Sequence, residues 1–73
     1  MQERNKRIGE TLEFYKNISK PIHITLESGG WLNGTITSIS EDRLVLQEEK
    51  YGEMLVLFER IKDDGIVPWK EKE

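Results

Sequence analysis

The chain contains no cysteine and only one histidine, His23, so neither a disulfide nor a structural zinc site is expected. No apolar run approaches the roughly 20 residues that a membrane-spanning helix needs. Residues 1–9 are almost all polar and show no signal peptide, so we expect a cytoplasmic protein without a membrane partner. Its 73 residues predict one domain, 1–73, which is too short to be very stable unless it packs unusually well or associates with itself.

The chain also lacks an excess of positive charge. The net charge of −3 argues against a protein that coats nucleic acid without specificity. Residues 1–39 carry five basic and four acidic side chains, a balance of +1, whereas residues 40–73 carry six basic and ten acidic ones, a balance of −4. Any contact with nucleic acid is therefore expected from the first half of the chain, or from backbone and stacking groups.

A hairpin is the strongest pattern that the chain does contain. Apolar and polar residues alternate over residues 21–27, which predicts a strand with one buried face. The Ser-Gly-Gly sequence at 28–30 predicts a turn, and residues 31–39 predict a second strand. Gly34, inside that strand, indicates a bulge, a bend or a close backbone approach. Such a hairpin is typical of a small barrel, because the sheet of a barrel must curl on itself.

A helix is predicted before this hairpin, over about residues 3–18. Ile8, Leu12 and Tyr15 fall on one face of that helix, and charged residues cover the others. Pro21 ends it, because the residue before a proline avoids helical angles. We expect the apolar stripe to cover one open end of the barrel.

Three more strands are predicted in the second half of the chain, at about residues 43–48, 53–61 and 66–69, with a turn at 62–65. The unbroken apolar run 54–58 predicts a strand that is covered on both faces. The predicted fold class is mostly β: a five-stranded, bent antiparallel open barrel capped by an N-terminal α-helix. The fourth strand would be an exposed apolar edge, so we expect it to pair with the fifth strand of a neighbouring copy and to close a ring.

Three segments occur in an order that is shared with a known family. The first is Pro21-Ile22-x-Ile24-x-Leu26-x-x-Gly29-x-x-Leu32-x-Gly34-x-Ile36, and the others are Leu44-Val45-Leu46 and Ile66-Val67-Pro68. After an N-terminal helix, this order resembles the Sm-like (LSm) family of RNA-binding proteins, and within it Hfq, the RNA chaperone. The resemblance covers roughly residues 5–69. It implies an Sm-like, SH3-like barrel, a homohexameric ring and the binding of single-stranded RNA.

The resemblance also implies an RNA face opposite the helix, formed by the first hairpin. Thr25 stands where the family usually has an aromatic residue. Trp31 is a candidate replacement for stacking a base, and packing within the barrel or against another subunit is the alternative. Asn33 is a candidate for bonding a base edge, or else bonds to its strand neighbours. The candidate residues of this face are Thr25, Gly29, Gly30, Trp31 and Asn33.

A second, uridine-binding face is implied on the helix side. There Leu57 and Glu59 stand where the family has an aromatic residue and a histidine, so that face has lost its usual groups. Phe58 and Arg60 are the candidates that would replace them, with core packing as the alternative for Phe58. Lys16 and Lys20 lie near positions that are basic in the family, which makes them candidates at the rim, with plain solvation as the alternative.

No catalytic residue, metal or cofactor is expected. His23 has no cysteine partner, the serines lie in no nucleophile motif, and the pairs of adjacent acids are predicted in turns. Two functions stay open. One is an Hfq-like ring that binds single-stranded RNA and acts as an RNA chaperone, and the other is a small SH3-like barrel that serves protein assembly without RNA.

Overall fold

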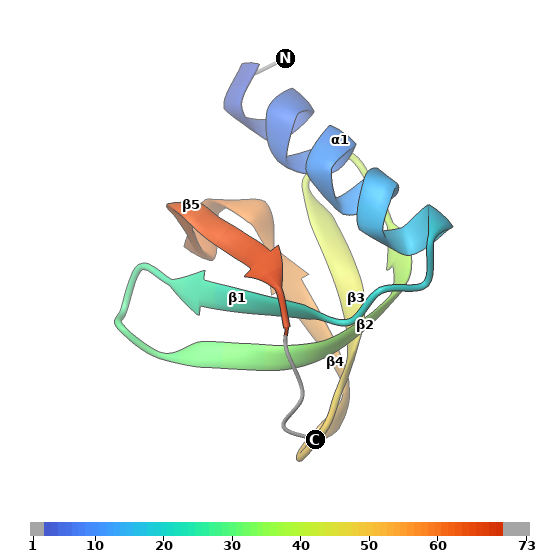
Figure 1. Cartoon of the computed structure of the whole chain (residues 1–73). Helices are drawn as coiled ribbons and strands as arrows, with labels where there is room; N and C mark the ends of the chain where they lie inside the picture. Colours follow the sequence, from blue (N-terminus) through green and yellow to red (C-terminus); the bar gives the residue numbers. More distant parts are fainter. Residues whose placement is uncertain (1–2, 70–73) are drawn as a thin grey trace.

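A computed structural model describes residues 3–69 and places one helix against an open five-stranded antiparallel sheet (Figure 1). This confirms the predicted fold class, mostly β with an N-terminal helix, and it is consistent with an Sm-like fold. The elements in chain order are α1 (Glu3–Asn17), β1 (Ile22–Leu26), β2 (Trp31–Ile39), β3 (Arg43–Glu48), β4 (Gly52–Leu57), the short 3-10 helix η1 (Phe58–Arg60) and β5 (Ile61–Pro68).

The core forms from the inward sides of the strands and one face of α1. Leu12 of α1 is fully buried, and Ile8 and Tyr15 pack against the same cluster, which confirms the predicted apolar stripe. Burial of this apolar surface is the main force that keeps the small, open sheet bent around its core. The buried core consists of Leu12, Ile22, Ile24, Leu32, Ile36, Leu44, Leu46, Val56, Phe58 and Ile61.

Gly34 allows β2 and β3 to approach each other closely. A Cβ atom at this position would lie 2.1 Å from the backbone oxygen of Gln47 and 2.9 Å from the Cα of Glu48. Both are backbone atoms, so they cannot move away as the end of a flexible side chain would. The prediction of a close backbone approach at Gly34 is therefore confirmed.

The helix α1 ends in a Schellman motif. The N–H of Lys20 donates to the carbonyl of Tyr15 at 3.0 Å, and the N–H of Ser19 donates to that of Lys16 at 3.1 Å. Ser19 has a φ of 55°, the left-handed conformation that this motif requires. The chain then enters β1 through Pro21, as the sequence predicts.

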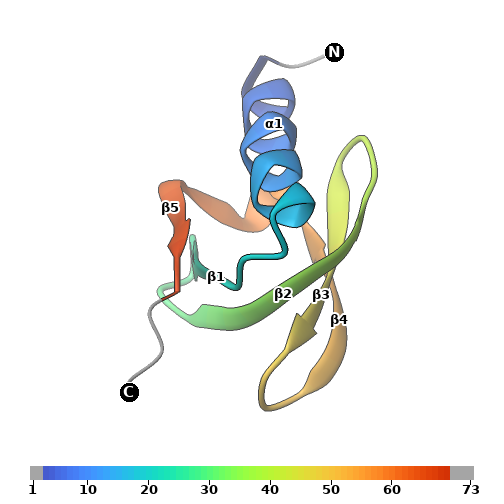
Figure 2. The same cartoon turned by 45° about the vertical axis from the view of Figure 1, so that its right-hand side comes forward.

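The strand order is β4-β3-β2-β1-β5, so β4 and β5 form the two edges of the sheet. In Figure 2, β2 runs across both halves of the bent sheet, and the hairpin of β2 and β3 rises beside α1. Leu55 of β4 is 57% exposed, although the apolar run 54–58 predicts a strand covered on both faces. Within the described chain, the outer face of β4 is therefore uncovered.

The boundaries of the last two strands differ from the prediction. The predicted strand 53–61 ends at Leu57. The 3-10 helix η1 begins at the next residue, Phe58, whose N–H donates to the carbonyl of Asp42 at 2.8 Å. The predicted turn 62–65 lies inside β5, which begins at Ile61 rather than at 66.

A bulge in β5 explains this difference. Leu26 of β1 pairs with Ile61, whereas Ile24 pairs with Ile66, so residues 62–65 of β5 stand opposite the single residue Thr25 of β1. Asp64 has a φ of 60°, and a Cβ at Gly65 would lie 2.8 Å from the carbonyl oxygen of Thr25. Residues typical of turns serve here to bend an edge strand.

Candidate nucleic-acid interface

The outward side of the β1–β2 hairpin carries most of the predicted site. The two strands pair in antiparallel register, with Thr25 opposite Trp31 and His23 opposite Asn33. Successive side chains of a strand point to opposite faces, so these four residues share the face away from the buried Ile24 and Leu32. The structure thus brings together Thr25, Trp31 and Asn33, and adds His23, which the sequence did not single out as a site residue.

Trp31 presents its ring to solvent. Its side chain is 63% exposed, so it does not pack in the core of its own chain. An exposed tryptophan at the start of a strand can stack a base, because every nucleobase has a flat π face. Burial of the same ring against another protein is the other use open to it.

The turn that leads into Trp31 depends on glycine. Gly29 has a φ of +100°, a conformation that side-chain-bearing residues rarely adopt. The turn is closed by the N–H of Leu26, which donates to the carbonyl of Gly30 at 2.8 Å, and by the N–H of Gly29, which donates to that of Leu26 at 2.9 Å. Gly29 therefore permits the turn that leads into Trp31, and Gly30 closes this turn through its carbonyl.

Asn33 is held by both its side chain and its backbone. Its Oδ1 lies 2.6 Å from Nδ1 of His23. Its backbone N–H donates to Oε2 of Glu48 at 3.1 Å, and its carbonyl accepts from the N–H of Glu49 at 2.9 Å. Asn33 therefore bonds to its neighbours, as one of the two sequence-based alternatives predicted, while its side chain stays partly exposed.

The side chain of Glu48 links Asn33 to the turn between β3 and β4. Its side chain is buried, and its Oε1 accepts from the backbone N–H groups of Lys50 at 2.7 Å and Tyr51 at 3.0 Å. Burial alone would raise the pKa of the Glu48 carboxyl, but the three backbone donors and the charge of Lys50 outweigh it and leave that pKa below its usual value. Sequence reasoning missed this role, because Glu48 looks like one of two adjacent acids in a predicted turn.

The other predicted site residues lie elsewhere. Lys16 and Lys20 are exposed at the end of α1 and in the link to β1, at the opposite end of β1 from Trp31 (Figure 1). Arg60 is exposed in η1, and its carbonyl accepts from the N–H of Glu27 at 2.8 Å. Phe58 is only 1% exposed, so its ring belongs to the core and offers no face to a base.

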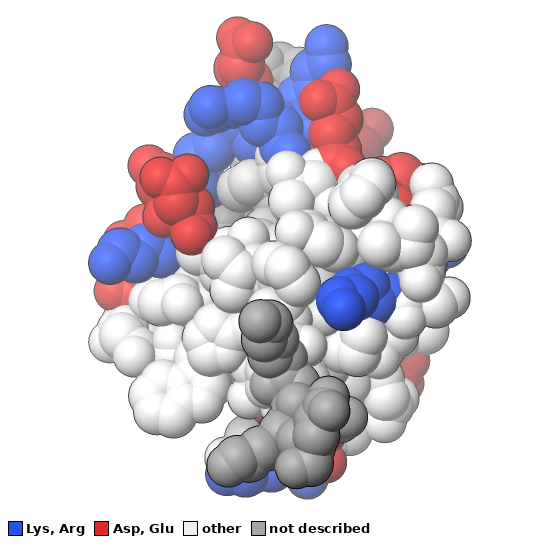
Figure 3. All heavy atoms as spheres, viewed as in Figure 1, with Lys and Arg blue, Asp and Glu red and all other residues white. Residues whose placement is uncertain are grey.

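Charged side chains are unevenly spread over the surface. In Figure 3, they gather over α1 and along one margin, while mostly uncharged atoms cover the region of β1, β2 and β5. Binding on such a face would come chiefly from stacking and hydrogen bonds, with few direct phosphate contacts.

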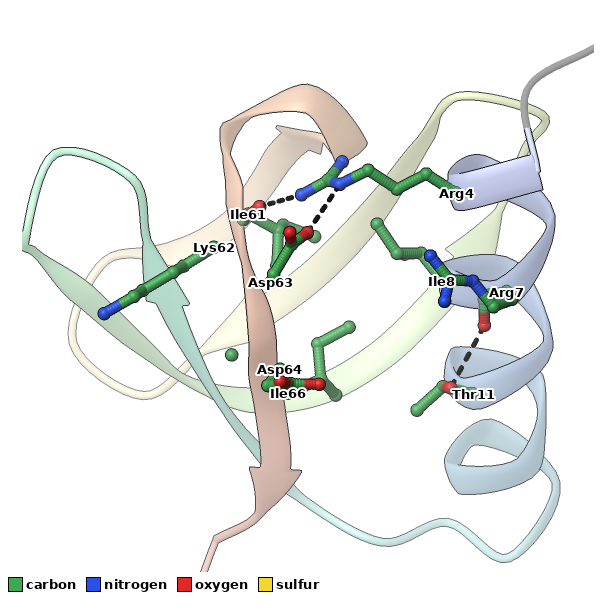
Figure 4. Close-up of a pocket in the computed structure, with 10 residues that line it drawn as sticks. Arg4, Arg7, Ile8, Thr11, Ile61, Lys62, Asp63, Asp64 and Ile66 are labelled. Atoms are coloured by element: carbon green, nitrogen blue, oxygen red, sulfur yellow. Dashed lines mark hydrogen bonds and ion pairs between the residues drawn. The ribbon is translucent and has the colours of Figure 1, made fainter.

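A cavity of about 370 Å³ lies between α1 and the bulge of β5 (Figure 4). Arg4 spans it: its Nε donates to Oδ1 of Asp63 at 2.8 Å, and its other nitrogens donate to the carbonyls of Phe58, at 3.2 Å, and Ile61. Asp64 also lines this space. Arg7 and Lys62 line it as well, so the walls carry both basic and acidic side chains, and Arg4 is already bonded at three points.

Neither a comparison with protein-family models nor one with curated proteins finds a match to this chain. In the part of the chain that the structure describes, no helix is long and apolar enough to cross a membrane. Residues 3–69 also bring together no group of three or more histidine, aspartate or glutamate side chains that could hold a metal ion.

Proposed function

We propose that this chain binds single-stranded RNA on the outward side of the β1–β2 hairpin, as an Sm-like protein of the Hfq type. The observation that carries the proposal is Trp31, a tryptophan that is 63% exposed beside the partly exposed Thr25 and Asn33. Together they offer a stacking surface next to hydrogen-bonding groups, which is the combination that reads unpaired bases. A stacked base contributes about 1–3 kcal/mol to binding.

The proposal includes assembly into a ring, which the resemblance implies to be a hexamer. Both edges of the sheet, β4 and β5, are free on one side within the described chain. Leu55 on β4 and Val67 on β5 are 57% and 43% exposed, and a partner strand would cover them. Unpaired apolar edges tend to pair with other strands, and the contact of β4 with β5 of the next copy joins two different surfaces, so it can close by rotation.

A ring would also account for the proposed activity as an RNA chaperone. Each copy supplies one β1–β2 hairpin, so a ring holds several close together. Linked sites raise the effective concentration of one RNA segment near another, which favours annealing. The exposed Lys16 and Lys20 would add attraction for phosphate near the helix.

Binding of labelled oligo(A) and oligo(U), followed by fluorescence anisotropy at increasing salt, tests the RNA proposal. We expect Trp31→Ala to weaken binding by about tenfold or more, because one stacked base contributes about 1–3 kcal/mol. Phe14→Ala is the matched control, since Phe14 is an exposed aromatic residue at 60% exposure but lies on α1. Absence of binding to both oligomers at low salt would refute the RNA proposal.

Light scattering of the purified chain tests the ring separately. We expect a mass several times that of the 8.6 kDa chain at micromolar concentration. Leu55→Glu, on the edge strand β4, should shift the mass toward that of one chain, because a charge would be buried in the contact. A monomeric parent chain would contradict the ring.

One observation favours the second candidate function, a small barrel for protein assembly without RNA. The second half of the chain carries a charge balance of −4 and also contains the exposed Leu55 and Val67, so its surface suits strand pairing better than contact with phosphate. This function predicts a stable oligomer that binds neither oligo(A) nor oligo(U).

A further inference from the structure

We propose that the groove between α1 and the β2–β3 turn binds a short basic segment of a partner protein, with an apolar side chain of that segment placed over Gly9. The groove has a volume of about 520 Å³, and its walls come from α1, the end of β2 with the turn that follows, and η1. None of the described residues that line it belongs to β1, β4 or β5, and Ile39 lies at the far end of β2 from Trp31. The groove is therefore separate from the proposed RNA face and from the proposed ring contacts.

The floor of the groove is apolar and open to solvent. Ile39 is partly buried there, and Phe58, which is almost fully buried, lies beneath it. The end of the β2–β3 hairpin rises beside α1 and forms the opposite wall (Figure 2). Covering such a surface with an apolar side chain removes it from water and favours binding.

Gly9 keeps this floor open. Glycine in the interior of a helix costs stability relative to alanine. Packing among the described residues does not require it: apart from its chain neighbours and the helix backbone, a Cβ atom at Gly9 would meet only Cε2 of Phe58, at 4.0 Å. That distance is an ordinary contact, so an alanine would fit the folded chain. Its methyl group would instead take up space at the floor of the groove.

Carboxylates stand on both sides of the groove. Glu10 and Glu13 are exposed on α1, and Glu41 is exposed in the turn opposite. Among the described residues that line the groove, Lys6 is the one basic side chain, so three acids and one base give a balance of −2. The rim is therefore complementary to a cationic partner.

This charge decides which macromolecule suits the groove. Asp42 and Arg43, the next residues of the turn, bond to each other at 2.8 Å and leave the balance unchanged. RNA would bring further negative charge to an acidic rim and would be repelled. A peptide with arginine or lysine on each side of an apolar residue would place a cation near each acidic wall and the apolar side chain on the floor.

The test measures the fluorescence anisotropy of three labelled synthetic peptides. In the leucine peptide, one leucine has two arginines on each side. The glycine peptide has glycine in place of the leucine, and the acidic peptide has glutamates in place of the arginines. We expect the parent chain to bind the leucine peptide about tenfold or more tightly than the glycine peptide, because a leucine side chain is buried. The acidic peptide should stay unbound.

Gly9→Ala separates binding from stability. Its methyl group should weaken binding of the leucine peptide by about tenfold, because it fills the space that the leucine would take. The same change should raise the melting temperature by about 4–8 °C, because alanine favours the helix. Thr11→Ala is the matched control, since it places a better helix former at an exposed position of α1 outside the groove. It should leave peptide binding unchanged.

Glu13→Gln tests the charge of the rim. We expect it to weaken binding of the leucine peptide by about two- to fivefold, the effect of one exposed ion pair, and the difference should shrink as salt is added. Glu53→Gln removes the same charge from an exposed position of β4 and should leave binding unchanged.

Four results would overturn this inference and leave the RNA proposal standing: equal binding of the leucine and glycine peptides by the parent, binding of neither, unchanged leucine-peptide binding in Gly9→Ala, or equal losses in Glu13→Gln and Glu53→Gln. We expect Gly9→Ala to bind oligo(A) and oligo(U) as the parent does. A loss of oligomer binding there, with peptide binding intact, would assign the groove to nucleic acid and overturn the inference as well. A parent that binds the leucine peptide but neither oligomer would overturn the RNA proposal alone.

Discussion

The buried carboxylate of Glu48, at the end of β3, accepts a hydrogen bond from the backbone N–H of Asn33 on β2 at 3.1 Å. The same carboxylate closes the β3–β4 turn through the N–H groups of Lys50 and Tyr51. One acidic side chain therefore ties the turn to the residue that lies at the centre of the candidate site.

We expect Glu48→Gln to lower the free energy of unfolding by about 1–3 kcal/mol, because one oxygen becomes an amide N–H₂ that faces a backbone donor. Denaturant unfolding measures this change. Glu49→Gln removes the same charge from the exposed neighbouring side chain and should have little effect. Equal losses in the two variants would show that charge, and not the buried bonds, decides the result.

Stability should also fall in acid because of Glu48. Its pKa is lowered in the folded chain from an ordinary value of 4.5, so the folded state binds this proton less readily than the unfolded state. The contribution is complete above that ordinary value and is lost as the pH falls through the lower, folded pKa. Unfolding free energies measured from neutral pH downward should therefore converge for the parent and Glu48→Gln. A constant gap down to the lowest pH would contradict this assignment.

Gly34→Ala should destabilise the chain by about 1–3 kcal/mol or more, because the new methyl group meets the Gln47 backbone and the strands must separate. Thermal and denaturant unfolding both report this loss. At Gly30 the nearest atoms to an added Cβ lie 3.9 Å away, so Gly30→Ala provides the control and should be tolerated far better. Similar effects at the two positions would argue against the close approach of β2 and β3.

Ser19→Gly should stabilise the chain by about 0.5–1 kcal/mol, because Ser19 occupies a left-handed conformation that costs a non-glycine residue energy. The gain is partial, since glycine also has more freedom in the unfolded chain. Ser28→Gly serves as the comparison, because Ser28 does not have a positive φ and should gain nothing. The melting temperature should rise in Ser19→Gly and stay unchanged in Ser28→Gly.

The sequence predicted the elements whose patterns depend on burial. The stripe Ile8, Leu12 and Tyr15 and the alternation in β1 reflect which side chains face the core, and both are confirmed. The Lys-Asp-Asp-Gly sequence at 62–65 was wrongly predicted as a turn, because the same residue types permit both a reversal of the chain and a bulge. Only the pairing with β1 distinguishes the two.

The site was predicted less completely than the fold. Periodicity places Trp31 on the outward side of β2, and its exposure follows from that. The bonds of Asn33 to His23 and Glu48 join residues that are 10 and 15 positions away, and they depend on the register of three strands. Arg4 is a similar case, because its partner Asp63 is 59 positions away.

The bulge in β5 limits how firmly two copies could be joined. Only the stretch from Ile66 to Pro68 runs regularly beside β1, and Pro68 has no N–H to donate. Each interface between two copies in such a ring would contain few backbone hydrogen bonds. Apolar contacts such as those of Leu55 would supply most of the stability of that interface. Such rings would dissociate on dilution and exchange protomers. An assembly that holds RNA would then release protomers that can assemble again.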